Sequence, residues 1–262
     1  MSWLQLSGQR MHYTEQGEGE AVVFLHGLLM DSTLFEPQIR FLRDRYRCIA
    51  LDARGHGRSD PPEGAFTQWD AAGDLIGLLD QMDIPAAHVV GMSQGGYAAL
   101  RAALDHPGRI KTLTLMSSQA GLENGEQRAR YHALLEHWLA RGLDGTVEPS
   151  LVRLLIGERP TETLPRWLET WRSTPPEVLL LTFAAVANRD DVTARLPEIR
   201  CPTLVIWGDS DPAVTQASVT DLCAGIRDCR LMRIGGGGHA VNLTHEEQVN
   251  PALLEFLDTH AT

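Results

Sequence analysis

The chain has 262 residues, 43% of them hydrophobic, and 23 Lys plus Arg against 34 Asp plus Glu give it a net charge of −11. This length and composition exclude a disordered or fibrous protein and indicate a folded core with room for an insertion. A nucleic-acid groove needs clustered basic residues to neutralise phosphates, and no basic run here exceeds two residues. We therefore expect no DNA or RNA partner.

The first residues have neither a basic start nor a long apolar stretch, and no later segment holds about 18 uninterrupted apolar residues. These features are typical of a protein without a signal peptide or a transmembrane helix. We therefore expect a soluble, cytoplasmic protein with no membrane partner, present as a monomer or a homodimer.

The four cysteines are widely spaced and form no C-x-x-C pair, so a zinc or redox site is not expected. They are Cys48, Cys201, Cys223 and Cys229. The last two are close enough in sequence to form a disulfide, but a chain of this size does not need one. The default expectation is buried free thiols, with no metal ion and no cofactor.

The chain opens on a predicted antiparallel hairpin, formed by Trp3 to Leu6 and Arg10 to Thr14. Short apolar runs then recur between segments of helical periodicity, which is typical of a parallel sheet covered on both faces. The predicted buried strands are Ala21 to Leu25, Arg47 to Leu51, His88 to Met92, Thr112 to Met116 and Thr203 to Trp207, with a further strand at Arg230 to Ile234. The predicted helices between them are Glu36 to Arg45, Trp69 to Met82 and Gln94 to Leu104.

The strand pattern stops between about Gly121 and Pro197, where only helical stretches are predicted. We therefore expect a core domain of residues 1–120 and 198–262 and a mainly helical cap of residues 121–197. Aromatic side chains of the cap suggest an apolar substrate pocket, although a tryptophan in a helix is more often a core residue. These side chains are Trp138, Trp167, Trp171 and Phe183. One of the cap's nine arginines could instead bind a carboxylated substrate.

A G-x-S-x-G motif lies between a predicted strand and a predicted helix, with Ser93 at its centre. A nucleophile at such a tight turn has its hydroxyl exposed, and Gly91 and Gly95 remove the Cβ atoms that would collide there. The amides and positive end of the following helix favour negative charge at the site. We predict that Ser93 is a catalytic nucleophile.

Serine needs a base, and His239 is the best candidate because it follows four glycines on a loop after a predicted strand. A carboxylate should orient this imidazole. Asp209 and Asp211 both follow the strand that ends at Trp207. We favour Asp211, whose position is better suited to reach over the sheet edge, while Asp209 can cap the turn.

A tetrahedral intermediate also needs two backbone donors for its oxyanion. We assign one to the amide of Gln94, directly after the nucleophile, and the other to Leu28, with Leu29 as the alternative. Leu29 and His26 are further candidates for the substrate pocket. His26 is at the same time the expected hydrogen-bonding partner that holds this loop.

Five segments together resemble the α/β-hydrolase superfamily over about residues 10–120 and 198–258. They are His26-Gly27, Asp52 to Ser59, Gly91 to Gly96, Gly208 to Asp211 and Gly238-His239. The chain order Ser, Asp, His is also that of the family. The resemblance implies an α/β-hydrolase fold, which is a mostly parallel twisted sheet flanked by helices, with a helical cap inserted.

Within the superfamily, Ser93 differs from the aspartate nucleophile of epoxide hydrolases and haloalkane dehalogenases. The segment after His26 lacks the glycine-rich loop of proline iminopeptidases and many carbon–carbon bond hydrolases. The chain looks closest to small esterases and enol-lactonase-like hydrolases. Two departures are Gln94, where many relatives carry Met, and Leu28, where cofactor-free haloperoxidases often carry an aromatic residue.

The resemblance and the motifs together indicate a carboxylesterase-like serine hydrolase that cleaves small-molecule esters through an acyl-enzyme intermediate. A lactonase or enol-lactonase is the first alternative, because ester and lactone pass through the same tetrahedral chemistry. Further alternatives are a carbon–carbon bond hydrolase, a cofactor-free haloperoxidase or perhydrolase, and a ligand receptor with slow turnover.

Overall fold

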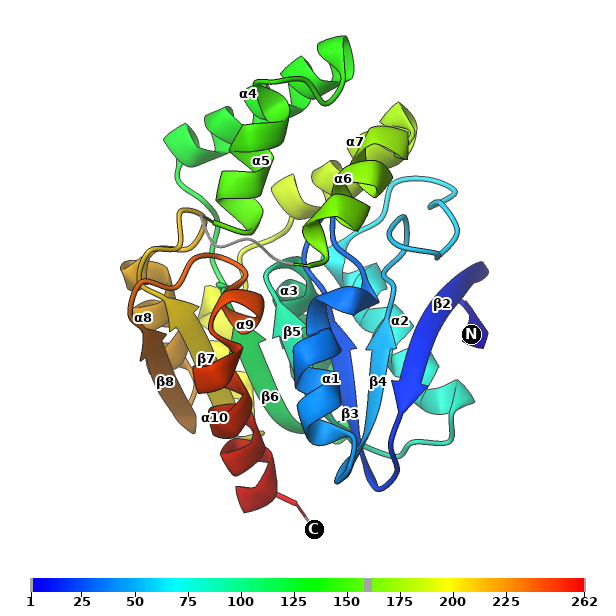
Figure 1. The fold of residues 1–262 in the computed structure, drawn as a ribbon. Coiled ribbons are helices and arrows are strands. Elements are labelled where there is room, and N and C mark those ends of the chain that lie inside the picture. The colour runs from blue at the N-terminus through cyan, green and yellow to red at the C-terminus, as the bar shows by residue number, and fades with distance from the viewer. Residues whose placement is uncertain (1, 158–161, 262) are drawn as a thin grey trace.

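The computed structural model describes residues 2–157 and 162–261. Within them the chain forms an eight-stranded sheet with the strand order β1-β2-β4-β3-β5-β6-β7-β8 (Figure 1). The edge strand β1 (Ser2–Leu6) forms the predicted hairpin with β2 (Gln9–Gln16), and β2 also pairs antiparallel with β4 (Tyr46–Leu51). All pairs from β4 to β8 are parallel.

The remaining strands confirm the apolar runs identified in the sequence. They are β3 (Glu20–Leu25), β5 (Ala87–Met92), β6 (Ile110–Met116), β7 (Thr203–Gly208) and β8 (Cys229–Ile234). Alternate residues of a strand face opposite sides of the sheet, and here both sides are covered. Val23 packs into one core cluster and Val22 into the other. Burial on both faces explains why the inner strands β3, β5, β6 and β7 are mostly apolar rather than alternating, whereas the edge strand β8 is mostly exposed or half-buried.

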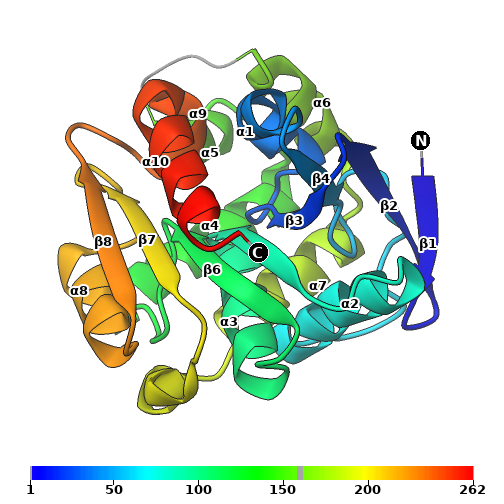
Figure 2. The same cartoon turned by 90° about the horizontal axis from the view of Figure 1, so that it is seen from below.

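Helices cover both faces of the sheet, which confirms the predicted mostly parallel, helix-flanked fold. One face carries α1 (Glu36–Leu42), α9 (Val241–Thr244) and α10 (Glu246–Thr259), and the other carries α2 (Gln68–Gln81), α3 (Gln94–Asp105) and α8 (Gln216–Gly225) (Figure 2). Helix α1 ends at Leu42, before the predicted Arg45, because the amide of Arg45 bonds to the Leu42 carbonyl in a turn that leads into β4.

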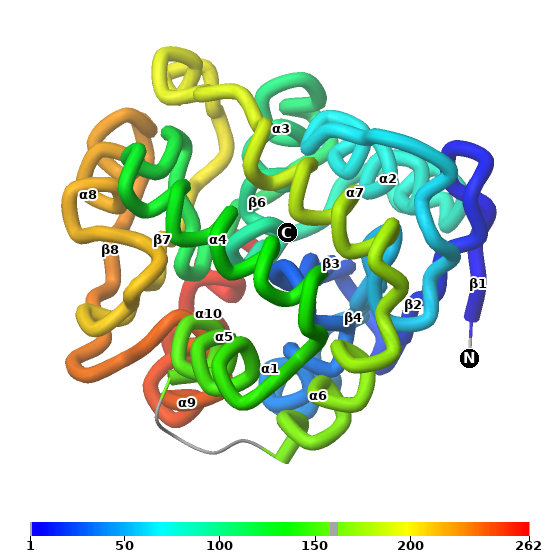
Figure 3. Tube along the Cα trace, turned by 90° about the horizontal axis from the view of Figure 1, so that it is seen from above, coloured from blue at the N-terminus to red at the C-terminus, as the bar shows by residue number. Residues whose placement is uncertain are grey.

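Between β6 and β7 the described residues form helices and no strand, as the lost strand pattern predicts. These are α4 (Gly125–Arg141), α5 (Val147–Leu155), α6 (Leu164–Ser173), α7 (Pro176–Ala187) and the 3-10 helix η2 (Thr193–Glu198). Helices α4 to α7 lie over the carboxyl ends of the parallel strands (Figures 1 and 3). Neither these helices nor any other in the described part of the chain has the length and apolar composition needed to cross a membrane.

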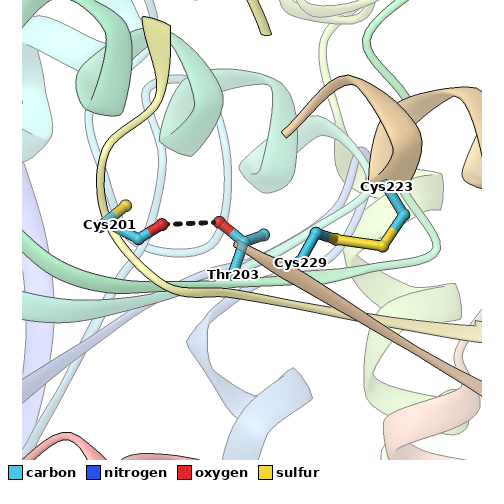
Figure 4. The surroundings of a disulfide bond; sticks show 4 residues. All are labelled: Cys201, Thr203, Cys223 and Cys229. Atoms are coloured by element: carbon cyan, nitrogen blue, oxygen red, sulfur yellow. Dashed lines mark hydrogen bonds between the residues drawn. A yellow bond between two sulfur atoms is a disulfide. The ribbon is translucent and has the colours of Figure 1, made fainter. Parts of the chain in front are cut away.

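The expectation of free thiols is wrong for Cys223 and Cys229, which form a disulfide (Figure 4). Helix α8 ends close to the start of β8, so the two Cα atoms are only 5.4 Å apart, within the range that a disulfide spans. Chain length indicates whether a fold needs a disulfide for stability, but it does not predict that two particular cysteines lie close together. Cys48 and Cys201 are buried free thiols, as expected.

Candidate active site

Ser93 occupies a strained turn between β5 and α3. Its backbone has φ 50° and ψ −115°, in the left-handed half of conformational space that L residues rarely adopt. A Cβ at Gly91 would collide with the backbone of Gly95, and one at Gly95 would collide with the carbonyl of Leu25. The Ser93 amide donates to the Met116 carbonyl at 2.9 Å, and the Ser93 carbonyl accepts from the Tyr97 amide and the Ser118 hydroxyl, both at 3.1 Å. The motif glycines are therefore required by close backbone packing.

His239 and Asp211 come from neighbouring loops at the carboxyl ends of β8 and β7, and they meet in a direct hydrogen bond. His239 Nδ1 lies 2.9 Å from Asp211 Oδ2 and 3.0 Å from Oδ1. Their side chains are only 3% and 0% exposed. Asp211 Oδ1 also accepts from the amides of Ala213, at 2.8 Å, and Val214, at 3.1 Å. These bonds fix the carboxylate and leave Nε2 of His239 on the opposite side of the ring.

Asp209, the other candidate acid, is directed elsewhere. Its carboxylate accepts from the guanidinium of Arg233, at 2.9 Å, and from the amide of Gly236, at 2.8 Å. The hydrogen bond from the Gly236 amide, and next the bond from Arg233, lower the pKa of Asp209. Asp209 thus links β7 to the glycine-rich loop after β8, whereas Asp211 contacts His239.

Ser93 and His239 line one cavity of about 250 Å³ between the sheet and helices α4, α5 and α7. Leu28, Leu29 and Phe183, all predicted pocket or loop residues, line it as well. Leucines supply most of the apolar wall: Leu134, Leu135, Leu151, Leu154, Leu155 and Leu180. This wall is suited to an uncharged hydrocarbon group placed next to Ser93.

The loop after β3 carries the predicted oxyanion donor and is held at several points. His26 Nδ1 bonds to the Gly27 carbonyl at 2.8 Å, and its Nε2 accepts from the amide of Ala53 at 2.9 Å. Leu29 has a positive φ of 64°, and its carbonyl accepts from the indole of Trp171. His26 therefore braces the loop, as expected, and lies outside the cavity lining. The amide of Gln94 belongs to the first turn of α3, whose first amides have no acceptor within the helix.

The structure corrects the expectation that cap tryptophans wall the cavity. Trp138, Trp167 and Trp171 are buried in the hydrophobic core, at 5%, 0% and 1% exposure, and only Phe183 of the four aromatic residues lines the cavity. Helical periodicity indicates that a side chain is buried, but it does not say which neighbour it faces. The cavity wall is made by leucines instead.

A buried polar group beside the cavity, made of Arg189, Glu123 and Tyr97, was not predicted from the sequence. Arg189 forms a two-point ion pair with Glu123, with distances of 3.0 and 2.9 Å, and its guanidinium lies 4.2 Å from the ring centre of Tyr97. Burial raises the pKa of Tyr97, so its hydroxyl keeps its proton. Tyr97 and Glu123 both line the cavity. Tyr97 lies four residues after Ser93, in the first turn of α3, and this spacing is the one sequence signal that could have indicated it.

Comparisons with known proteins agree on one family. The family model described as alpha/beta hydrolase fold matches residues 20–246. A segment of the polyketide synthase ThaQ of Burkholderia thailandensis is 34% identical over 258 residues, which is 96% of this chain but only 12% of that synthase. The 3-oxoadipate enol-lactonase 1 of Acinetobacter baylyi is 28% identical, over 87% of this chain and 85% of that enzyme.

A thermophilic esterase of Thermogutta terrifontis, solved with malate bound, has a similar structure, with a TM-score of 0.88. It is 25% identical, and the match covers 100% of this chain and 99% of that one. The similarity therefore extends over the sheet and over the helices between β6 and β7.

Proposed function

Since the chain belongs to the α/β-hydrolase fold family, we propose that it is a serine hydrolase that cleaves carboxylic esters through an acyl-enzyme intermediate. The observation that carries this proposal is the cavity shared by Ser93 and His239, with Asp211 hydrogen-bonded behind the imidazole. Such a cavity brings a strained, accessible serine and an oriented histidine to one substrate. The esterase and enol-lactonase relatives support the same reaction class.

Ser93 is the proposed nucleophile and His239 its base. The Ser93 oxygen attacks the ester carbonyl, its proton passes to His239 Nε2, and Asp211 holds the imidazole and stabilises the imidazolium. The amides of Leu28 and Gln94 donate to the oxyanion. Collapse of the tetrahedral intermediate breaks the bond to the alcohol, which leaves with the proton from His239. Water then hydrolyses the acyl-enzyme by the same steps.

Residues 121–197 are the proposed cap over a core of residues 1–120 and 198–262. Helices α4, α5 and α7 contribute most of the cavity wall, which supports a role in choosing the substrate. A small-molecule lactone is the second candidate substrate. The enol-lactonase relative favours it, because that match covers most of both chains and ring opening of a lactone uses the same attack.

The first test is hydrolysis of p-nitrophenyl esters from acetate to laurate, together with several lactones. We expect Ser93→Ala to lower turnover by a factor on the order of 10³ to 10⁶. The apolar wall predicts that kcat/KM rises by roughly threefold to fourfold per added methylene until the chain fills the cavity. The preferred acyl-chain length thus reports how long a hydrocarbon chain the cavity accommodates.

The matched control is Ser210→Ala, which removes the hydroxyl of an exposed serine beside Asp211. This variant should keep the turnover of the unaltered protein. A Ser93→Ala variant that retains most of its activity would contradict the proposed mechanism.

A further inference from the structure

The wall of the cavity is unevenly polar along α4. The C-terminal part of this helix contributes the leucines Leu134 and Leu135. The N-terminal part contributes three hydrogen-bond donors, Arg128, Tyr131 and His132. Because the three are spaced i, i+3 and i+4, they share one face of the helix, and that face borders the cavity. Among the described arginines of residues 121–197, Arg128 is the one that lines the cavity.

The Tyr131 hydroxyl has a proton available for a ligand. It accepts a hydrogen bond from Gln127 Nε2 at 3.0 Å, and Gln127 in turn donates to the Ala213 carbonyl at 2.7 Å. Burial raises the pKa of Tyr131, so the hydroxyl stays protonated. The Gln127 contacts hold Tyr131 against the loop that carries Asp211, and no acceptor for the Tyr131 O–H is present in the described part of the chain.

Two charged groups of the cavity have charged partners, since Glu123 pairs with Arg189 and His239 with Asp211. Glu123 is neutralised by its two-point ion pair with Arg189. Within residues 2–157 and 162–261, no carboxylate forms a hydrogen bond or ion pair with Arg128, and Arg128 is the one arginine in the cavity lining. The neighbouring Arg130, in contrast, is paired with Glu126 on the exposed surface. Arg128 is exposed at the cavity, and an unpaired guanidinium in this position favours an anionic ligand group.

We propose that Arg128, Tyr131 and His132 bind a carboxylate of the substrate, so that the protein selects esters or lactones with one apolar arm and one carboxylate-bearing arm. The identity of the reaction rests on the proposed function, but carboxylate binding does not require turnover. Arg128 supplies the charge and a planar pair of donors that match a carboxylate. Tyr131 supplies a fixed neutral donor, and the leucines accept the other arm.

The kinetic test uses substrate pairs that differ only in charge. One pair is mono-p-nitrophenyl adipate and its terminal amide, and the other is 4-carboxyphenyl butyrate and its 4-carbamoyl analogue, so each ester arm is probed. We expect Arg128→Gln to lower the anionic-to-neutral ratio of kcat/KM about tenfold or more for one pair, because an ionic hydrogen bond is lost. Arg128→Lys should recover part of that ratio, and added salt should reduce it in the unaltered protein.

The matched control is Arg130→Gln. Arg130 is two residues from Arg128, carries the same charge and lies outside the cavity lining. This variant should leave the ratio unchanged. An equal loss of ratio in both variants would mean that long-range charge alone is at work, and it would overturn the proposal. The proposal would also be overturned if Arg128→Gln lowered kcat/KM equally for the charged and the neutral substrate of each pair.

Calorimetric titration separates this inference from the proposed function. We expect adipate to bind the unaltered protein more tightly than adipamide, and Arg128→Gln to remove that difference. If adipate binds in this way while no ester is cleaved, the hydrolase proposal fails and the carboxylate site stands. If esters are cleaved through Ser93 and adipate shows no advantage over adipamide, the carboxylate site is refuted.

Discussion

At the scale of single residues, the two aspartates after β7 have different partners. Asp211 accepts from two backbone amides and from His239, whereas Asp209 pairs with Arg233 at the surface. A carboxylate that holds an imidazole acts on turnover, because it sets the tautomer and stabilises the imidazolium. A carboxylate that links two loops, as Asp209 does, stabilises the local structure of those loops.

We therefore predict that Asp211→Asn lowers kcat by a factor on the order of 10² to 10⁴ with a folded protein. Asp209→Asn, which changes the same group two residues away, should alter kcat by less than about tenfold, because asparagine can still accept from the Gly236 amide and only the ion pair to the exposed Arg233 is lost. Steady-state kinetics on the best ester of the panel measures both. A larger loss in Asp209→Asn would reverse the assignment of the acid.

At the scale of elements, α6 fixes the loop after β3. The indole of Trp171 donates to the carbonyl of Leu29, a residue with φ 64° in the loop that carries the proposed oxyanion donor. Trp167, one turn earlier on the same helix, is equally buried, but its indole nitrogen has no hydrogen-bond partner among the described residues. The two tryptophans therefore differ in one hydrogen bond.

Replacing each by phenylalanine measures what that bond contributes. Both changes remove similar volume, so the difference between them reports the hydrogen bond. We expect Trp171→Phe to cost about 1 kcal/mol more in the free energy of unfolding than Trp167→Phe, and to lower kcat severalfold by loosening the loop. Denaturant unfolding and ester kinetics provide the two readouts. Equal effects in both would show that α6 does not fix the loop through this bond.

At the scale of the whole molecule, a buried histidine links folding stability to pH. His56 is 6% exposed, and its Nδ1 donates to the Arg54 carbonyl at 3.0 Å. Burial is the main cause that lowers the pKa of His56 from 6.5 to about 3. The unfolded chain thus binds a proton at about pH 6.5 that the folded chain binds only near pH 3. Between these values the folded state loses stability as the pH falls.

We predict that the free energy of unfolding falls by up to about 1.4 kcal/mol per pH unit on account of His56 as the pH is lowered from 6.5 towards 3. Denaturant unfolding at several pH values in this interval measures the slope. His56→Asn should have a shallower slope, by as much as one proton's contribution, because it removes the titrating group. An unchanged slope in this variant would show that other groups cause the acid sensitivity.

The sequence by itself determined the sheet and the tight turn at Ser93, and it predicted the pairing of His239 with Asp211 that the structure shows. Strands buried on both faces require continuous apolar runs, and the turn requires glycines at Gly91 and Gly95 because backbone atoms lie against them. These constraints act on residues close together in the chain. They can therefore be recognised from a local pattern. The loops after parallel strands lie at the same edge of the sheet, and this indicates which of these patterns come together.

Only the tertiary structure decided what surrounds Ser93. Periodicity predicts the burial of Trp167 and Trp171 equally well whether they face a cavity or the core, and the structure places both in the core, with Trp171 also at a second cavity that Ser93 does not line. It also places Arg128, alone among the described arginines of residues 121–197, in the cavity lining, and it joins Cys223 to Cys229. Each of these outcomes depends on how separate helices and strands pack against one another. A one-dimensional pattern records that a side chain is buried or charged, but the packing of distant elements decides which group it meets.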